Sequence, residues 1–438
     1  MRTKTRDSSS YGFDYLSGLL RIETKRTMAN ISRKTGRPYQ NMHHFMSNSP
    51  WSGPGLIAMV QNEVKRHPEF QEAIAILDES ADERAGNHSA GASRQHNGRL
   101  GKVDMCQVGV FLSLATPRVH TWIDGELYIP ECWFEEAYAK HREKAGIPKE
   151  RVFQTKPELG WQMIQRAVSR HVPFKAVAMD ELYGRNNTLR QRLDRAGIEY
   201  YGDVPANTIV YLDKPVIIYP KTKRGQQSKR PKIVAKQRYE VRQLLNHPGL
   251  EWHTITIRPN ERGVLRAQFA RCRVWTVYGT QCRQEWLLIR KDGHRHTYVL
   301  SNAALDTPLE TMAWRQSHRY FIERDNQDCK SELGWDEFQA IKYLAWEHQL
   351  ALTILASWFI AETRLDWMSR YQRDPALLEH YEVDVLPMLS VANVRTLLIA
   401  AMSLPQLSGR EAAMLVIEHL INRTRSRKSH LRRQSVPP

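Results

Sequence analysis

The sequence is short of cysteine and has no hydrophobic run long enough to span a membrane. Its five cysteines are scattered among 438 residues, and no two of them form a C-x-x-C pair. An odd number of dispersed cysteines is typical of a reducing compartment rather than of a secreted, bridged protein. The longest apolar stretch, residues 350–360, is shorter than the ~18 residues of a membrane span and is interrupted by Thr353 and Ser357. We therefore expect a buried helix there and no membrane association.

The N-terminal segment also lacks the features of a targeting peptide. It begins MRTKTRDSSSYGF, in which no apolar stretch follows the charges, so it is not a secretory signal. The early acids Asp7 and Asp14 are unlike a transit peptide. These observations predict a cytoplasmic protein.

Acidic residues are too few to balance the basic ones. The chain has 64 Lys and Arg against 47 Asp and Glu, which gives a net charge of +17. Such an excess suits a polyanionic partner, because each basic side chain placed on a phosphate releases condensed counterions. A basic but merely soluble protein is the alternative. Apolar residues at 41% and charged residues at 25% otherwise describe a globular chain, long enough for about three domains.

Changes of pattern along the chain predict an α/β protein in five segments. Residues 1–72 form a helical, DNA-binding region, and a break at 36–38 gives a possible helix-turn-helix with its recognition helix from Tyr39. Alternating strands and helices predict the first part of a catalytic core. The remaining segments are a basic, mostly β insertion, a helical second part of the core and a helical basic C-terminal region. The first part of the core spans 73–213, the insertion 214–315, the second part of the core 316–405 and the C-terminal region 406–438.

Two acids stand at the ends of apolar runs predicted to be buried strands. They are Asp78 in AIAILD and Asp180 in AVAMD. A carboxylate held at the end of a buried strand is rigid yet accessible, as a ligand of a hard divalent cation must be, although an Asp at such a place also caps turns and helices. Competing acids follow Asp78 in a segment rich in Gly, Ala and Ser that we interpret as a loop, and Asp78 is preferred because it ends the apolar run. These competitors are Glu79, Asp82 and Glu83.

A third group of polar residues shares one face of a predicted helix. At 100° per residue, the helical positions of Gln316, Arg319 and Lys330 lie within 40° of that of Glu323. A solvated helix face with an i,i+4 ion pair would have the same pattern. A carboxylate for a metal ion beside cations for phosphate oxygens is also what phosphodiester chemistry requires.

These residues resemble the signature of DDE transposases of bacterial insertion sequences, in the branch with a β insertion in an RNase H-like core. That branch has Y-x2-R-x3-E-x6-K; here Arg319, Glu323 and Lys330 match it and Gln316 replaces the tyrosine. The stretches LDES, HSAGASRQHNGRLGKVDMCQVGVFLSLA, MDELYG and ELGWDEFQAIKYLAWEHQLALTILA resemble further family segments in the correct order. Asp180 and Glu323 are 143 positions apart, which leaves room for the insertion.

The resemblance implies an RNase H-like mixed sheet flanked by helices and a site of three acids, Asp78, Asp180 and Glu323. These acids would bind two Mg2+ ions ~3.5–4 Å apart, with Mn2+ as a substitute. Arg319, Lys330 and Gln316 would contact DNA phosphates. The substrate would be double-stranded DNA carrying the terminal inverted repeats of the element, and then target DNA. A homodimer on DNA, in the cytoplasm of a bacterium and associated with its nucleoid, is expected.

Other interpretations of the sequence stay open. The same acids could serve a metal-dependent nuclease without strand transfer, or the chain could be a domesticated, inactive DNA-binding protein. The replaced tyrosine leaves open whether a DNA hairpin intermediate forms. Trp275 and Trp286 could stack on an unpaired base or belong to a core. A zinc site is a further possibility at Cys272, Cys282, His294 and His296, although their spacing matches no common site.

Neutralising the basic lead-in of the insertion tests its role in DNA binding. The substitutions Lys229→Ala, Arg230→Ala and Lys232→Ala together should weaken binding, because these side chains are expected to bind phosphates. The slope of log K against log salt should flatten by up to ~0.9 for each phosphate that is no longer neutralised. Titrations of labelled DNA at several salt concentrations measure this slope. An unchanged slope would remove the segment from the DNA interface.

Overall fold

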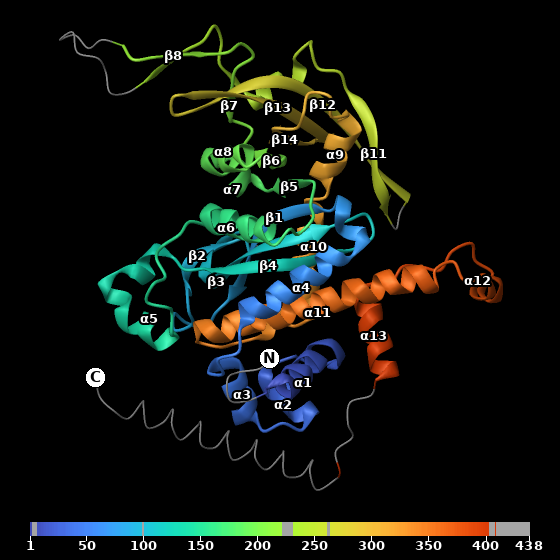
Figure 1. Ribbon diagram of the computed structural model, residues 1–438. Coiled ribbons are helices and arrows are strands. Elements are labelled where there is room, and N and C mark those ends of the chain that lie inside the picture. The colour runs from blue at the N-terminus through green and yellow to red at the C-terminus, as the bar shows by residue number, and fades with distance from the viewer. Residues whose placement is uncertain (2–6, 99, 221–230, 261–262, 403–407, 409–438) are drawn as a thin grey trace. The chain divides into compact units, whose positions relative to one another are not determined.

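The computed structural model describes residues 1, 7–98, 100–220, 231–260, 263–402 and 408 (Figure 1). The chain divides into two compact units, residues 57–327 and residues 1–56 with 328–438. The first unit contains a ten-stranded mixed sheet with helices, and the described part of the second is helical. Within the described residues, no helix is both long and apolar enough to cross a membrane.

Five strands of the first unit form the mixed sheet that the sequence predicted. Their spatial order is β4-β3-β1-β5-β6. β4, β3 and β1 are antiparallel neighbours, whereas β5 and β6 run parallel to β1. This arrangement confirms the RNase H-like α/β fold class. The strands are β1 (Ile74–Glu83), β3 (Lys102–Ala115), β4 (His120–Tyr128), β5 (Ala176–Met179) and β6 (Tyr200–Val204), and β2 (Ser93–Asn97) pairs with β3.

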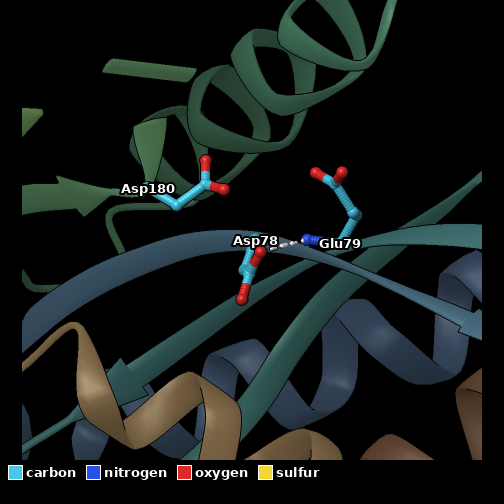
Figure 2. Close-up of side chains that lie close together, drawn as sticks. All are labelled: Asp78, Glu79 and Asp180. Carbon is cyan, nitrogen blue, oxygen red and sulfur yellow. Dashed lines mark hydrogen bonds between the residues drawn. The ribbon is translucent and has the colours of Figure 1, made fainter. Parts of the chain in front are cut away.

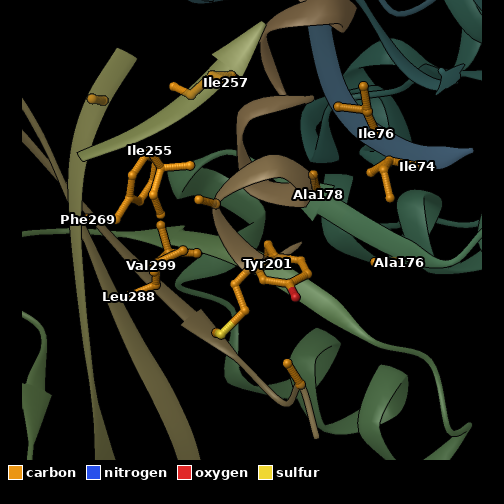
Figure 3. Packing of buried hydrophobic residues seen from close by; sticks show 14 of the residues in the cluster. Ile74, Ile76, Ala176, Ala178, Tyr201, Ile255, Ile257, Phe269, Leu288 and Val299 are labelled. Carbon is orange, nitrogen blue, oxygen red and sulfur yellow. The ribbon is translucent and has the colours of Figure 1, made fainter. Parts of the chain in front are cut away.

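Helices cover both faces of this sheet because alternate side chains of its strands are apolar on each side. Ile74 and Ile76 of β1 belong to a buried cluster that also contains Ile322 of α10 (Figure 3). Leu77 points to the other face, where it packs against Gly160 of α6. The helices of this unit include α5 (Ala139–Ala145), α6 (Lys156–Ser169), α7 (Glu181–Gly184), α8 (Asn187–Arg195), α9 (Leu309–Ser317) and most of α10 (Tyr320–Ser331).

The segment 79–100, predicted to be a loop, contains strand at both of its ends. β1 continues to Glu83, which lies opposite Cys106 of β3. Ser93–Asn97 forms β2, on the other edge of the polar end of β3. The prediction was wrong here because β3 is 14 residues long and offers ladder partners that composition does not reveal.

The β-rich insertion lengthens the core sheet. Strands β11, β12, β13 and β14 form an antiparallel meander, and β14 then pairs with β6 of the core. The strands of residues 214–315 are β8 (Val216–Ile218), β9 (Lys232–Val234), β10 (Tyr239–Glu240), β11 (His253–Asn260), β12 (Gly263–Tyr278), β13 (Gln281–Asp292) and β14 (Arg295–Ser301); β7 (Ile209–Val210) pairs with β10.

A buried charge network ties the insertion to the core. Glu285 of β13 is fully buried and accepts hydrogen bonds from Arg190 of α8, Tyr200 of β6 and Thr276 of β12. Burial would raise the pKa of Glu285, but Arg190 and Arg283 outweigh it and lower that pKa below its ordinary value. A buried carboxylate with this many donors is satisfied, and it fixes β13 against α8.

The described part of the second unit is helical, as predicted for the N-terminal region, while the predicted helical segment 406–438 lies outside the described residues except for residue 408. The break at 36–38 is real: Gly36 ends α2 in the left-handed region with a φ of 70°, as a glycine tolerates. Tyr15 donates a hydrogen bond to Gln349, which joins the N-terminal helices to the buried α11. The helices are α1 (Ser9–Arg21), α2 (Met28–Thr35), α3 (Tyr39–Ser47), the start of α4 (Gly53–Arg66), α11 (Tyr343–Arg370), α12 (Pro375–Tyr381) and α13 (Val391–Ala401).

The close approach of α7 to β6 predicts a position at which only glycine fits. A Cβ at Gly184 would lie 2.0 Å from the carbonyl oxygen of Asp203 and 2.6 Å from the carbonyl carbon of Gly202. Both are backbone atoms, so Gly184→Ala should destabilise the fold by about 1–3 kcal/mol or more. Chemical denaturation measures the change. Gly86→Ala is the control, because nothing lies within 4 Å of its Cβ; equal stabilities of the two variants would contradict this packing.

Candidate active site

Two acids meet because each directly follows the last pair of the parallel ladder between β1 and β5. Asp180 follows the end of β5, but Asp78 does not end its strand as the sequence predicted, because β1 continues to Glu83 along β3. β1 and β5 pair in parallel with Leu77 opposite Met179, so Asp78 and Asp180 follow at the same level of the sheet. Asp180 caps helix α7: its Oδ1 accepts hydrogen bonds from the backbone N–H groups of Leu182 (2.9 Å) and Tyr183 (3.2 Å). The capping role that the sequence left open is real, and it holds the carboxylate at the sheet edge.

Asp78, Glu79 and Asp180 form an acidic cluster in which one oxygen from each lies within 4.8 Å of the others. Figure 2 shows that Asp78 and Glu79 leave β1 on opposite sides of the strand. Asp78 shares the face of Ile76, which packs toward α10, and its Oδ1 accepts from the backbone N–H of Glu79 at 2.8 Å. Asp78 is therefore the acid of this pair on the same side as the helix that carries Glu323.

Glu79 lies on the α6 face of the sheet. Its Oε1 accepts a hydrogen bond from Lys156 of α6 at 2.9 Å. The reason given for preferring Asp78, that its competitors lie in a loop, is wrong, because Glu79, Asp82 and Glu83 are all strand residues. The side of the sheet and the ion-pair partner now distinguish these acids from Asp78. Glu79 already has Lys156 beside it, and Asp82 is buried further along the strand.

The electrostatics of the cluster favour a positive charge in it. Burial, followed by the charge of Asp180, raises the pKa of Asp78 well above its ordinary value. Burial, followed by the charge of Glu79, raises the pKa of Asp180 to about 6. Like charges in a desolvated site raise a pKa in this way, and a bound cation would relieve the repulsion. Carboxylate oxygens are the ligands that hard divalent ions prefer.

Arg319 lies between the candidate acids of the sheet and of α10. Its Nε contacts Asp203 of β6 at 3.1 Å, and its Nη1 contacts Glu323 at 3.0 Å. Burial alone would lower the pKa of Arg319, but Asp203, Glu323, Asp78 and Asp180 raise it above the ordinary value. The side chain of Glu323 is 53% exposed, and its carboxylate lies outside the 4.8 Å acidic cluster.

A pocket of about 590 Å³ brings these elements together. Its acids include Asp180, Asp203 and Glu323, and Gln316 and Arg319 also line it. Glu181 and, on the insertion, Asp292 are further acidic lining residues. Its opposite side comes from the insertion, with Arg258, Arg290 and Arg295 among the lining residues. The single helix predicted for this stripe is wrong, because Gln316 belongs to α9 and Arg319 lies in the turn before α10. Gln316, Arg319 and Glu323 nevertheless line one pocket with Asp180.

Lys330 and Lys232, two of the predicted phosphate-binding residues, are not among the described residues that line the pocket. Lys330 lies on α10, seven residues and about two turns after Glu323. Lys232 is exposed at the start of β9. Lys229 and Arg230 lie outside the described residues, as does most of the C-terminal segment 406–438.

Asp203 is the site residue that sequence reasoning missed. It is buried in β6, where burial raises its pKa to about 6. Besides Arg319, its carboxylate accepts a hydrogen bond from Nε2 of Gln316 at 3.4 Å. The signal was an acid inside the buried strand YYGDV, where an isolated carboxylate is costly without a partner.

The helix that carries Glu323 is fixed by neighbouring side chains that face away from the pocket. His120 Nδ1 of β4 lies 2.6 Å from Oδ1 of Asp325, and Nε1 of Trp122 donates to Asn326 at 3.1 Å. Asp325 is 3% exposed. The structure therefore separates Glu323, which lines the pocket, from Asp325, which anchors α10 to the sheet.

The alternatives at the insertion receive no support in the described residues. Among the described residues, the one cluster of side chains placed to hold a metal ion is the acidic cluster of the core. Cys272, Cys282, His294 and His296 therefore form no zinc site. Trp286 packs against the apolar cluster and lies under the guanidinium groups of Arg271 and Arg273 at 4.4 and 4.8 Å. Trp275 has Lys214 over its ring at 5.2 Å.

Comparisons with known proteins agree with this geometry. A family model described as a DDE superfamily endonuclease matches residues 2–264. A curated relative from Microchaete diplosiphon, described as a probable transposase for insertion sequence element IS701, is 24% identical over 344 residues. The match covers 76% of this chain and 77% of the relative.

The raised pKa of Asp180 predicts that this residue destabilises the metal-free protein. The native state retains a proton that the unfolded chain releases between about pH 4 and pH 6, so stability falls as the pH rises through this window. Asp180→Asn removes the charge and keeps a capping side chain. We expect it to raise the melting temperature near neutral pH, by a free energy on the order of 1 kcal/mol, and to change little below about pH 4.

Thermal denaturation with and without divalent ions measures both effects. Divalent ions should stabilise the wild type but not Asp180→Asn, because a ligand that binds the folded state raises its stability. Asp306→Asn, at an exposed loop position, is the control and should change neither curve. A lower melting temperature for Asp180→Asn in the metal-free protein near neutral pH would contradict the repulsion described above.

Proposed function

Because this chain belongs to the DDE superfamily of endonucleases, we propose that it is a DNA transposase that cuts and joins the ends of an insertion sequence. It is an enzyme that acts on DNA, and its family depends on divalent metal ions. The relative's description supports transposition over the alternatives of a simple nuclease or an inactive binder. The observation that carries the proposal is the pocket in which Asp180, Glu323 and Arg319 lie at the edge of an RNase H-like sheet.

We assign the catalytic and metal-binding roles to Asp78, Asp180 and Glu323, with Mg2+ as the ion. The residues fit such an ion: all offer carboxylate oxygens, and the pKa values of Asp78 and Asp180 are raised by burial and by neighbouring acids. Mn2+ also accepts oxygen ligands. When bound, two such ions supply Lewis-acid stabilisation of the attacking and leaving oxygens.

The chain's own residues orient the DNA and balance its charge. In the first reaction, water attacks a phosphodiester at the end of the element, and the 3′ oxygen leaves and takes up a proton. In the second, the freed 3′-OH attacks a target phosphodiester and loses its proton, and the 3′ oxygen of the target strand leaves and takes up a proton. Arg319 can offer N–H donors to a phosphate as a planar fork while Asp203 holds its Nε. Lys330 would act as a point charge.

Gln316 is the weakest of the proposed phosphate ligands. It is buried, and its amide donates to Asp203. A contact between this amide and a phosphate would have to replace that hydrogen bond or use the other amide hydrogen. The usual tyrosine of the signature would have supplied a hydroxyl instead, so a hairpin intermediate is not part of the proposal.

The proposed partner of this protein is double-stranded DNA. The net charge of +17 suits DNA, and the helices of residues 1–72 together with the basic segments 214–238 and 406–438 are the proposed contacts to it. Cutting two ends requires both to be held in one complex, so we propose a homodimer on DNA. A bacterial cytoplasm, at the nucleoid, is where such a substrate occurs.

Cleavage of DNA that carries the gene's own flanking ends tests the function. Purified protein with Mg2+ should cut at the ends, and Asp180→Ala should lower the rate by at least about 10³-fold while binding persists. A denaturing gel gives the cleavage and a mobility shift gives the binding. Asp306→Ala, at an exposed loop position, should cut like the wild type. Binding without cleavage by the wild type would instead favour a domesticated binder.

A matched pair on α10 tests the third acid. Glu323→Gln should abolish cleavage, whereas Asp325→Asn should retain it at lower thermal stability, since Asp325 contacts His120 rather than the pocket. The reverse result would transfer the third role to Asp325.

A further inference from the structure

Arg258 reaches the active-site pocket from the insertion. It lies on β11 directly after a shift in the register between β11 and β12, at Thr256 and Arg258, where a bulge redirects side chains. Its guanidinium carbon lies 4.2 Å from the ring centre of Tyr320 and 4.9 Å from that of Phe321. These two residues open α10, three and two positions before Glu323. The insertion therefore places a cation beside the catalytic helix.

Within the described part of the chain, this guanidinium has no carboxylate partner and donates no hydrogen bond. The same holds for Arg295, an exposed residue of β14 that lines the same pocket. The other arginines of the pocket differ: Arg290 contacts Asp292 at 3.0 Å, and Arg319 contacts Asp203. Arg258 thus brings an uncompensated positive charge to a pocket whose other side holds acids.

Stacking fixes the guanidinium of Arg258 without using its hydrogen-bond donors. A guanidinium packed by its face against an aromatic ring keeps the N–H groups of its edge free, in a fork that matches two phosphate oxygens. Two rings hold it here, so little side-chain freedom is left to lose on binding. A phosphodiester is the anion whose geometry and charge match such a fork.

We propose that Arg258, stacked on Tyr320 and Phe321 and assisted by Arg295, forms a phosphodiester-binding subsite on the insertion side of the pocket. This inference rests on the proposed function, and it names the part of the DNA that the insertion contacts. The phosphate it binds belongs to the strand being cut, next to the scissile phosphate, because Arg258 and Glu323 line one pocket. The insertion thereby contributes to the active site itself.

The salt dependence of DNA binding tests this subsite. Arg258→Ala should flatten the slope of log K against log salt by ~0.9, which corresponds to one fewer neutralised phosphate, and should slow cleavage by about 10-fold or more. Arg258→Lys should restore the slope but not the full rate, because an ammonium lacks the planar fork. Arg266→Ala is the control, since Arg266 is exposed on the adjacent strand β12 and lies outside the pocket.

The outcomes separate this inference from the proposed function. A purely structural role for Arg258 would lower the melting temperature and leave the slope unchanged, and that result would overturn the subsite. An effect of Arg266→Ala equal to that of Arg258→Ala would also overturn it, because the charge would then act from anywhere on the insertion. If the wild type binds duplex DNA but does not cut its ends, the proposed function fails, while the slope still decides the role of Arg258. If the wild type binds no DNA, both fail.

Discussion

Mutual repulsion among buried carboxylates is the constraint on which this site depends. Asp78 and Asp180 meet because they directly follow Leu77 and Met179, the last pair of the parallel ladder between β1 and β5, and burial raises the pKa of each. Among the described residues, Arg319 offsets part of this repulsion. It contacts Asp203 and Glu323 and interacts electrostatically with Asp78 and Asp180. A site with this charge distribution is prepared for divalent cations.

Packing between the helices and the sheet brings these acids together. Glycine at position 184 lets α7 approach the backbone of β6, which brings the cap at Asp180 and the carboxylate of Asp203 into one region. β4 anchors α10 through His120 and Trp122, so that Glu323 lies over the pocket. The acids thus come from three strands and a helix, and the packing between these elements sets their distances.

The insertion is joined to the core more closely than a separate domain would be. Its strand β14 extends the core sheet through β6, and the buried Glu285 network ties β13 to α8. A rigid connection of this kind lets β11 carry Arg258 to α10 at a fixed position. The insertion therefore contributes residues to the pocket.

The sequence by itself determined the fold class and the family, and it singled out Asp78 and Asp180 as acids that follow apolar runs. Apolar runs ending in Asp78 and Asp180 are local signals, whereas the turn at Arg319, which the helix period did not predict, was not visible in the sequence. Only the tertiary structure decided which face Glu79 takes, that Asp203 supports Arg319, and that Arg258 reaches the pocket. These features depend on strand register and on contacts between residues far apart in the chain, which local patterns do not encode.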